Sequence, residues 1–125
     1  MKTNEVARLR LHNQGIAAGR FKNPSDVARW FGAVQAQDYL GSLWALGLRL
    51  PGTRETEVER AVADRSIVRT WPLRGTLHFV AAEDVRWMLR LLGARTVARA
   101  AGRYRQLGLD EATFDKSRRV LARAL

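Results

Sequence analysis

The chain has 125 residues, of which 46% are hydrophobic, which is enough for one domain with its own core and too little for two roomy ones. The chain has no cysteine, which excludes disulfides and thiolate metal sites, and with only two histidines a zinc site is not expected. It has no apolar stretch of roughly 20 residues, so a soluble cytoplasmic protein is predicted. The net charge of +10, carried mostly by arginine, favours a polyanionic partner such as nucleic acid, although it can also serve solubility alone.

Two helices are predicted in the first part of the chain. Apolar residues at helical spacing predict a helix over residues 6–16, with a glycine near its end. The segment Asn23-Pro24-Ser25-Asp26 is a strong helix start, with Asn23 as N-cap, Pro24 in the first turn and Asp26 favoured by the helix dipole. The second helix is predicted to run through Val34.

Two further helices are predicted between residues 40 and 66. Residues 40–50 are apolar nearly all round and stop at Pro51-Gly52, which predicts a buried central helix. The segment from Thr56 to Glu59 fits a capping box that begins the next helix. The four tryptophans lie in apolar segments and are expected to pack in the core: Trp30, Trp44, Trp71 and Trp87. Only Trp71, at the predicted hairpin, is also a candidate for DNA contact.

The second half of the chain begins with a predicted β-hairpin. Residues 67–73 and 75–80 are rich in β-branched and aromatic residues, with a turn expected at Arg74-Gly75. A helix is then predicted from residue 82, interrupted near Gly93, with a helical pattern continuing to residue 108. Asp110 starts a last helix that is still running at Leu125, so the chain is expected to be cut within a larger protein.

The predicted fold is mainly α with a small β-hairpin, in the element order of a winged helix-turn-helix followed by further helices. A winged-helix domain is expected over residues 1–81. Residues 82–125 are expected to be a helical extension that begins a second winged-helix domain.

Three segments together resemble one known family. The sequence GAVQAQDY at residues 32–39, followed by SLWALGLRL and then by TWPLRGTLHFV, is similar to the AlkZ-type DNA glycosylases, which are winged-helix DNA-binding proteins. The similarity covers nearly the whole chain. It implies a longer protein of tandem winged helices around a DNA channel, in which this chain is the amino-terminal part. The chain is then expected to contact the missing downstream domains and to be inactive by itself.

The resemblance implies a catalytic role for Gln35 and Gln37, which match the family's Gln-x-Gln signature for excision of alkylated or cross-linked purines. An N7-alkylated purine is already a cationic leaving group, so its release needs a positioned water more than a strong general acid. Two neutral amides can hold such a water through their fixed donors and acceptors. Residues two apart on an α-helix diverge by about 200°, so the helix must end or distort at Gln35 if both act together. Without the resemblance, a solvated helix end is the favoured interpretation of the two glutamines.

Asp38 has three possible roles. It is a candidate base, an orienter of Gln37, or the N-cap of the helix that follows. No metal and no redox cofactor are expected.

Double-stranded DNA is the expected partner, and the resemblance implies that the hairpin lies near it. Arginines 95, 99 and 103 fall at i, i+4 and i+8 on one helical face, where like charges favour a polyanion, although a solvated basic face is equally compatible. The candidate DNA-binding residues are Arg69, Arg74, Thr76, His78, Arg95, Arg99 and Arg103. The alternative function is a non-catalytic winged-helix DNA-binding module, such as a transcriptional regulator.

Overall fold

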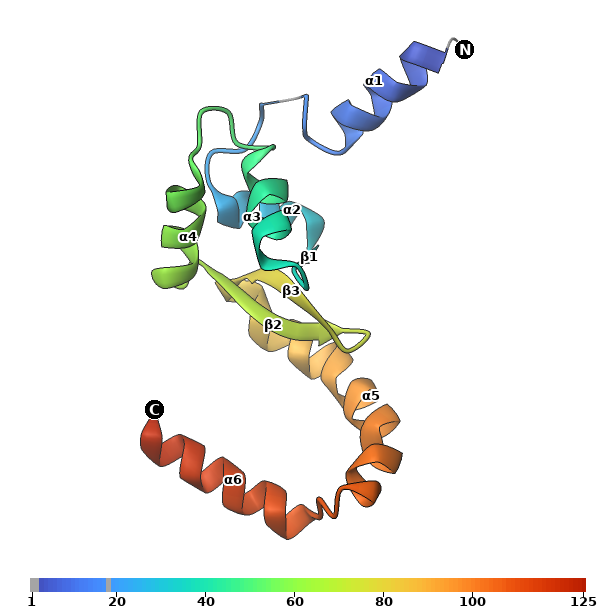
Figure 1. Ribbon diagram of the computed structural model, residues 1–125, viewed down its shortest axis with the longest axis vertical. Helices are drawn as coiled ribbons and strands as arrows, with labels where there is room; N and C mark the ends of the chain where they lie inside the picture. The colour runs from blue at the N-terminus through green and yellow to red at the C-terminus, as the bar shows by residue number, and fades with distance from the viewer. Residues whose placement is uncertain (1–2, 18) are drawn as a thin grey trace.

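A computed structural model describes residues 3–17 and 19–125 and has mainly helices with one small antiparallel sheet (Figure 1). Helices α2, α3 and α4 lie together on one side of the sheet, and α5 runs along the other side. The elements in chain order are α1 (Thr3–Asn13), α2 (Pro24–Phe31), β1 (Val34–Gln35), α3 (Tyr39–Gly47), α4 (Glu55–Ala63), β2 (Ile67–Leu73), β3 (Thr76–Ala81), the 3₁₀ turn η1 (Ala82–Asp84), α5 (Val85–Gln106) and α6 (Glu111–Ala124).

Capping residues fix where α2 and α4 begin. The Asn23 side chain accepts the Asp26 N–H at 2.9 Å and Pro24 opens the helix, which confirms the predicted start of α2. The capping box predicted from Thr56 is wrong, because α4 begins at Glu55. There the Glu57 carboxylate accepts the Arg54 N–H at 2.8 Å, a bond that does not depend on the side chain at the cap position.

The predicted hairpin is confirmed. Arg74 and Gly75 both have positive φ, 54° and 70°, the conformation of a tight two-residue turn between antiparallel strands. The sheet also has a third strand that the sequence did not predict: its order is β1-β3-β2. The helix predicted through Val34 is wrong, because α2 ends at Phe31 and Gly32 closes it with φ 74°.

The core lies between the sheet and helices α2, α3 and α4. Its members are fully or almost fully buried and come from all of these elements: Val27, Leu43, Leu46, Val58, Ile67 and Phe79. The all-round burial predicted for residues 40–50 is wrong, because only one side of α3 meets the core. Leu40 and Trp44 on its other side are 65% and 68% exposed.

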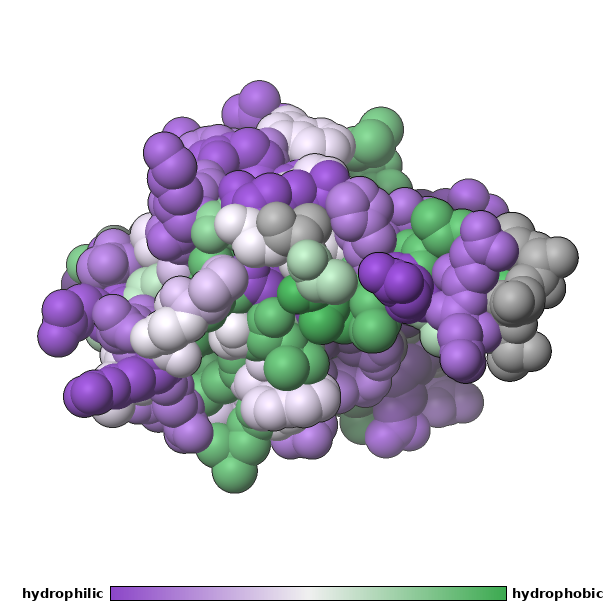
Figure 2. All heavy atoms as spheres, turned by 90° about the horizontal axis from the view of Figure 1, so that it is seen from above, coloured by the Kyte–Doolittle hydropathy of each residue, from purple (hydrophilic) through white to green (hydrophobic). Residues whose placement is uncertain are grey.

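The four tryptophans are exposed rather than packed in the core, which corrects the sequence-based prediction; their exposed fractions range from 45% to 68%. Trp30 has an edge contact with Phe31 and the Arg20 guanidinium above its ring, and Trp87 donates to the Asp84 carboxylate. Figure 2, the view from above Figure 1, shows an apolar patch within a largely hydrophilic face.

Helix α5 is continuous over 22 residues, so the interruption predicted near Gly93 is wrong. One glycine costs a helix about 1 kcal/mol relative to alanine, too little to break one of this length. Asp110 caps α6 as predicted, and the hydroxyl and N–H of Thr113 both donate to its carboxylate, which holds the pKa of Asp110 below its usual value. Within the described ranges no helix is long and apolar enough to cross a membrane.

Candidate active site

The two glutamines lie on non-helical backbone just after α2, Gln35 in a short strand and Gln37 in a bend. Gln35 is in β1, and the chain stays non-helical until α3 begins at Tyr39. The Gln35 Nε2 donates to Gln37 Oε1 at 2.9 Å, while Ala36 between them is fully buried in the core. The geometric condition for joint action, an end to the helix before Gln35, is therefore met.

Cross-strand pairing places Gln35 in a row with two residues of the hairpin. Gln35 pairs with His78 of β3, which pairs in turn with Thr70 of β2, so the three side chains share one sheet face. Phe79, on the opposite face, belongs to the core. Gln35 therefore faces away from the core, and α5 contacts β2 at the opposite edge of the same sheet.

His78 does not reach the surface in this structure. Its side chain is 3% exposed, and Nδ1 lies 2.8 Å from the Thr76 carbonyl. A carbonyl can only accept, so Nδ1 carries the proton in this contact. His78 supports the sheet beneath Gln35, whereas the sequence analysis expected it to face DNA. Thr76, the other predicted contact on this strand, is half-buried and its hydroxyl lies 3.4 Å from the Leu73 carbonyl.

Asp38 is the N-cap of α3, one of its three predicted roles. The carboxylate accepts the Gly41 N–H at 3.2 Å, and the backbone at Asp38 is extended, as capping requires. No pattern in the sequence indicates that Gly41 leaves room for this contact. A Cβ on Gly41 would lie 2.4 Å from Asp38 Oδ2, closer than atoms can approach.

Replacing Asp38 separates its role as a cap from a role as a base. Asparagine is also a good N-cap, so Asp38→Asn is expected to keep both stability and any base release, whereas Asp38→Ala loses about 1 kcal/mol of unfolding free energy. Urea unfolding and single-turnover release of alkylated base measure the two effects. Strongly slowed release by Asp38→Asn at unchanged stability would contradict capping as the sole role of Asp38 and would indicate that the carboxylate also acts as a base.

Replacing Gly41 tests the close contact with the cap. Alanine in place of a helical glycine ordinarily stabilises by about 0.5–1 kcal/mol. Gly41→Ala is expected to show no such gain because the Asp38 carboxylate must move away. Gly47→Ala is the matched control in the same helix, since nothing lies within 4 Å of a Cβ there. Equal stabilisation by the two variants in urea unfolding would contradict the contact.

Arg69, predicted to bind DNA, directs its guanidinium at the backbone of the glutamine segment. Its Nε and one Nη donate to the Ala36 carbonyl at 2.9 and 2.7 Å, and the same Nη lies 3.2 Å from the Gln37 carbonyl. The guanidinium also stands 5.4 Å from the centre of the Tyr39 ring. Sequence analysis missed this contact because it joins residues more than 30 positions apart.

The hairpin turn and α5 bring three of the predicted DNA-binding arginines together. Arg74, Arg95 and Arg99 line one hollow, with Leu73, Leu92 and Thr96 between them. All three arginines are exposed, and Arg103, also exposed, lies one turn further along α5. Within residues 3–17 and 19–125, none of these four arginines pairs with a carboxylate. Their charges remain available to an anion.

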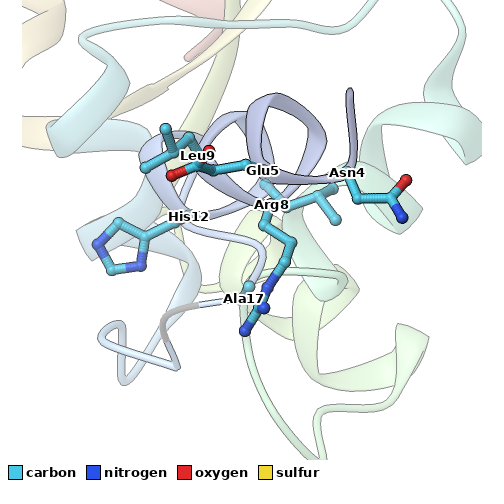
Figure 3. A pocket seen from close by; sticks show the side chains of 7 residues that line it. Asn4, Glu5, Arg8, Leu9, His12 and Ala17 are labelled. Carbon is cyan, nitrogen blue, oxygen red and sulfur yellow. The ribbon is translucent and has the colours of Figure 1, made fainter. Parts of the chain in front are cut away.

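A larger hollow lies along α1, apart from the glutamine pair. Arg8 extends from the helix toward Ala17, with His12 on one side of it and Asn4 on the other (Figure 3). Both signs of charge occur along it, and it contains none of the residues that the sequence analysis singled out. The size of a pocket alone therefore does not identify the candidate active site.

Comparison with known proteins shows which family the chain belongs to. The sequence model of the family described as "DNA glycosylase AlkZ-like" matches residues 28–125. The chain belongs to this AlkZ-like DNA glycosylase family.

One relative is the "Interstrand DNA cross-link repair glycosylase" of Streptomyces sahachiroi, with 31% identity over 88 residues; the match covers 70% of this chain and 24% of that protein. The solved structure of Streptomyces sahachiroi DNA glycosylase AlkZ matches with 33% identity and a TM-score of 0.52, over 58% of this chain and 19% of the other. The chain thus spans about a quarter of the curated relative.

Proposed function

We propose that the protein hydrolyses the N-glycosidic bond of alkylated purines in double-stranded DNA, with N7 adducts or cross-linked purines as substrates and Gln35 and Gln37 as catalytic residues. The observation that carries the proposal is the exposed amide pair, joined at 2.9 Å on a strand edge in a chain of a DNA glycosylase family. The name of the cross-link repair relative supports the substrate class.

The chemistry fits a site without a strong acid. Alkylation at N7 makes the purine cationic, so when the C1′–N9 bond breaks its electron pair neutralises the departing base. Water then bonds to C1′ and releases a proton. After forming their mutual bond, the two amides still offer a carbonyl acceptor and N–H donors in fixed directions, which can hold one water. No metal and no redox cofactor enter this reaction.

DNA binding is proposed for the basic surface at the hairpin turn and along α5. Arg74, Arg95, Arg99 and Arg103 are exposed arginines without carboxylate partners in the described ranges, and arginine suits bidentate contact with phosphate. Gln35 faces away from the core and α5 contacts β2 of the same sheet, and we propose that one duplex spans both the arginine surface and the amide pair.

We infer further that residues 1–81 form a winged-helix domain and that residues 82–125 extend it toward another one. The order helix, short strand, two helices and hairpin over residues 24–81 supports this inference, with β2 and β3 as the wing. Since the chain spans 24% of its relative's length, base release is proposed for the gene's full-length product and not for these 125 residues alone.

A comparison of binding with turnover tests the proposal against a non-catalytic DNA-binding module. The full-length product is mixed in excess with a duplex that carries one N7-methylguanine, and released base and bound DNA are both measured. Release well above the spontaneous rate is expected, and an unmodified duplex provides the control. Tight binding without release from N7-methylguanine or cross-linked DNA would favour the non-catalytic module.

A further inference from the structure

Arg69 contacts the glutamine segment at its backbone and not at its side chains. The guanidinium bonds the carbonyls of Ala36 and Gln37, the two peptide groups on either side of the Gln37 Cα. The two carbonyls thus lie before and after the Cα of Gln37, whose side chain accepts the hydrogen bond from Gln35. Any rotation of either peptide would swing the Gln37 amide away from its partner.

Besides the burial of Ala36 and the Asp38 cap, few hydrogen bonds hold the backbone of the segment. Strand β1 is two residues long and pairs only with β3, and its ladder ends where the Ala36 N–H donates to the Leu77 carbonyl at 2.8 Å. The Ala36 carbonyl is satisfied by Arg69 instead, and a buried carbonyl without a partner is costly. Arg69 thus completes the hydrogen bonding that the short strand leaves unfinished.

Arginine suits this task better than lysine. Its planar fork gives two N–H bonds to one carbonyl and a third to the next, while its Cζ lies over the Tyr39 ring, 5.4 Å from the ring centre. A lysine ammonium keeps the charge but has neither the fork nor the planar face.

We propose that Arg69 is a positioning residue that fixes the backbone of residues 35–37, so that the two glutamine amides converge on the reacting water. This inference rests on the proposed glycosylase function and changes the role predicted from sequence, in which Arg69 binds DNA. The two roles differ in what they alter: positioning acts on the rate of the bound complex, whereas phosphate contact acts on affinity and on its salt dependence.

The experiment uses Arg69→Lys in the full-length product, with Arg60→Lys as the matched control, because Arg60 is exposed on α4 and has no role in the site. Single-turnover release of N7-methylguanine at saturating protein is expected to slow by about 10-fold or more, since small misplacements of catalytic groups are costly. DNA affinity and its salt slope are expected to stay unchanged. Hydrogen exchange is expected to quicken at residues 36–38.

Three results would overturn the positioning role. The first is weaker DNA binding with an unchanged rate at saturation, which would make Arg69 a phosphate contact. The second is unchanged exchange at residues 36–38, and the third is faster exchange spread evenly over the chain, which would make Arg69 a general stabiliser. If the unmodified protein releases no base, the proposed function fails by itself, while the exchange measurement still decides whether Arg69 holds the segment.

Discussion

Replacing Gln35 and Gln37 together with alanine is expected to slow base release by about 100-fold or more while leaving DNA binding intact. The two amides form an exposed pair, and neither side chain contributes to the core, so the fold does not depend on them. Without them a water near C1′ loses its fixed donors and acceptors. Single-turnover release of N7-methylguanine, with affinity measured on the same duplex, separates the two effects.

A control for this pair removes two amides elsewhere on the surface. Asn4 and Asn13 are both exposed on α1, and changing them to alanine is expected to leave release and binding as they are. The catalytic role would be contradicted if the Gln35 and Gln37 variant released base at the unmodified rate. Parallel loss of binding and release would instead indicate a DNA contact.

Replacing Arg74, Arg95 and Arg99 with glutamine is expected to weaken DNA binding by about 10-fold or more at ~0.15 M salt. Each phosphate contact contributes about 0.9 to the slope of log affinity against log salt, so three lost contacts reduce its magnitude by close to 3. Binding should fall equally for all sequences, since phosphate carries no sequence information. A salt titration of duplex binding measures both quantities.

The matched control removes the same number of positive charges at positions outside the pocket lined by Arg74, Arg95 and Arg99. Arg8, Arg10 and Arg60 are exposed on α1 and α4, and their replacement by glutamine is expected to alter the salt slope by less than 1. If both triple variants weakened binding to the same extent, the basic charge would act only through the net field of the protein.

Local signals predicted the parts of the fold that local chemistry decides. Asn23 with Pro24 marked the start of α2, and Arg74-Gly75 marked the hairpin turn, because cap and turn geometry depend on neighbouring residues. Strand β1 was missed because two residues carry no periodic pattern, although Gly32 could have ended the helix in the prediction. Apolar composition overstated burial in α3, since it cannot tell how many sides of a helix are covered.

The geometry around the two glutamines was predicted only in part. The requirement that the helix end before Gln35 followed from helical periodicity, and the amide pair meets it. The burial of His78 and the backbone contacts of Arg69 depend on which strands pair and on how α5 covers the sheet. Such contacts between distant segments leave no pattern in a single sequence.

The central claim is that Gln35 and Gln37 act as one unit on one water, and a double-mutant cycle on base release tests it most directly. The single variants Gln35→Ala and Gln37→Ala are compared with the double variant under single-turnover conditions at saturating protein. A joined pair predicts that each single variant loses nearly as much rate as the double variant, with a coupling energy of at least about 1 kcal/mol. Losses that simply multiply, or single variants that release base at the unmodified rate, would contradict the claim.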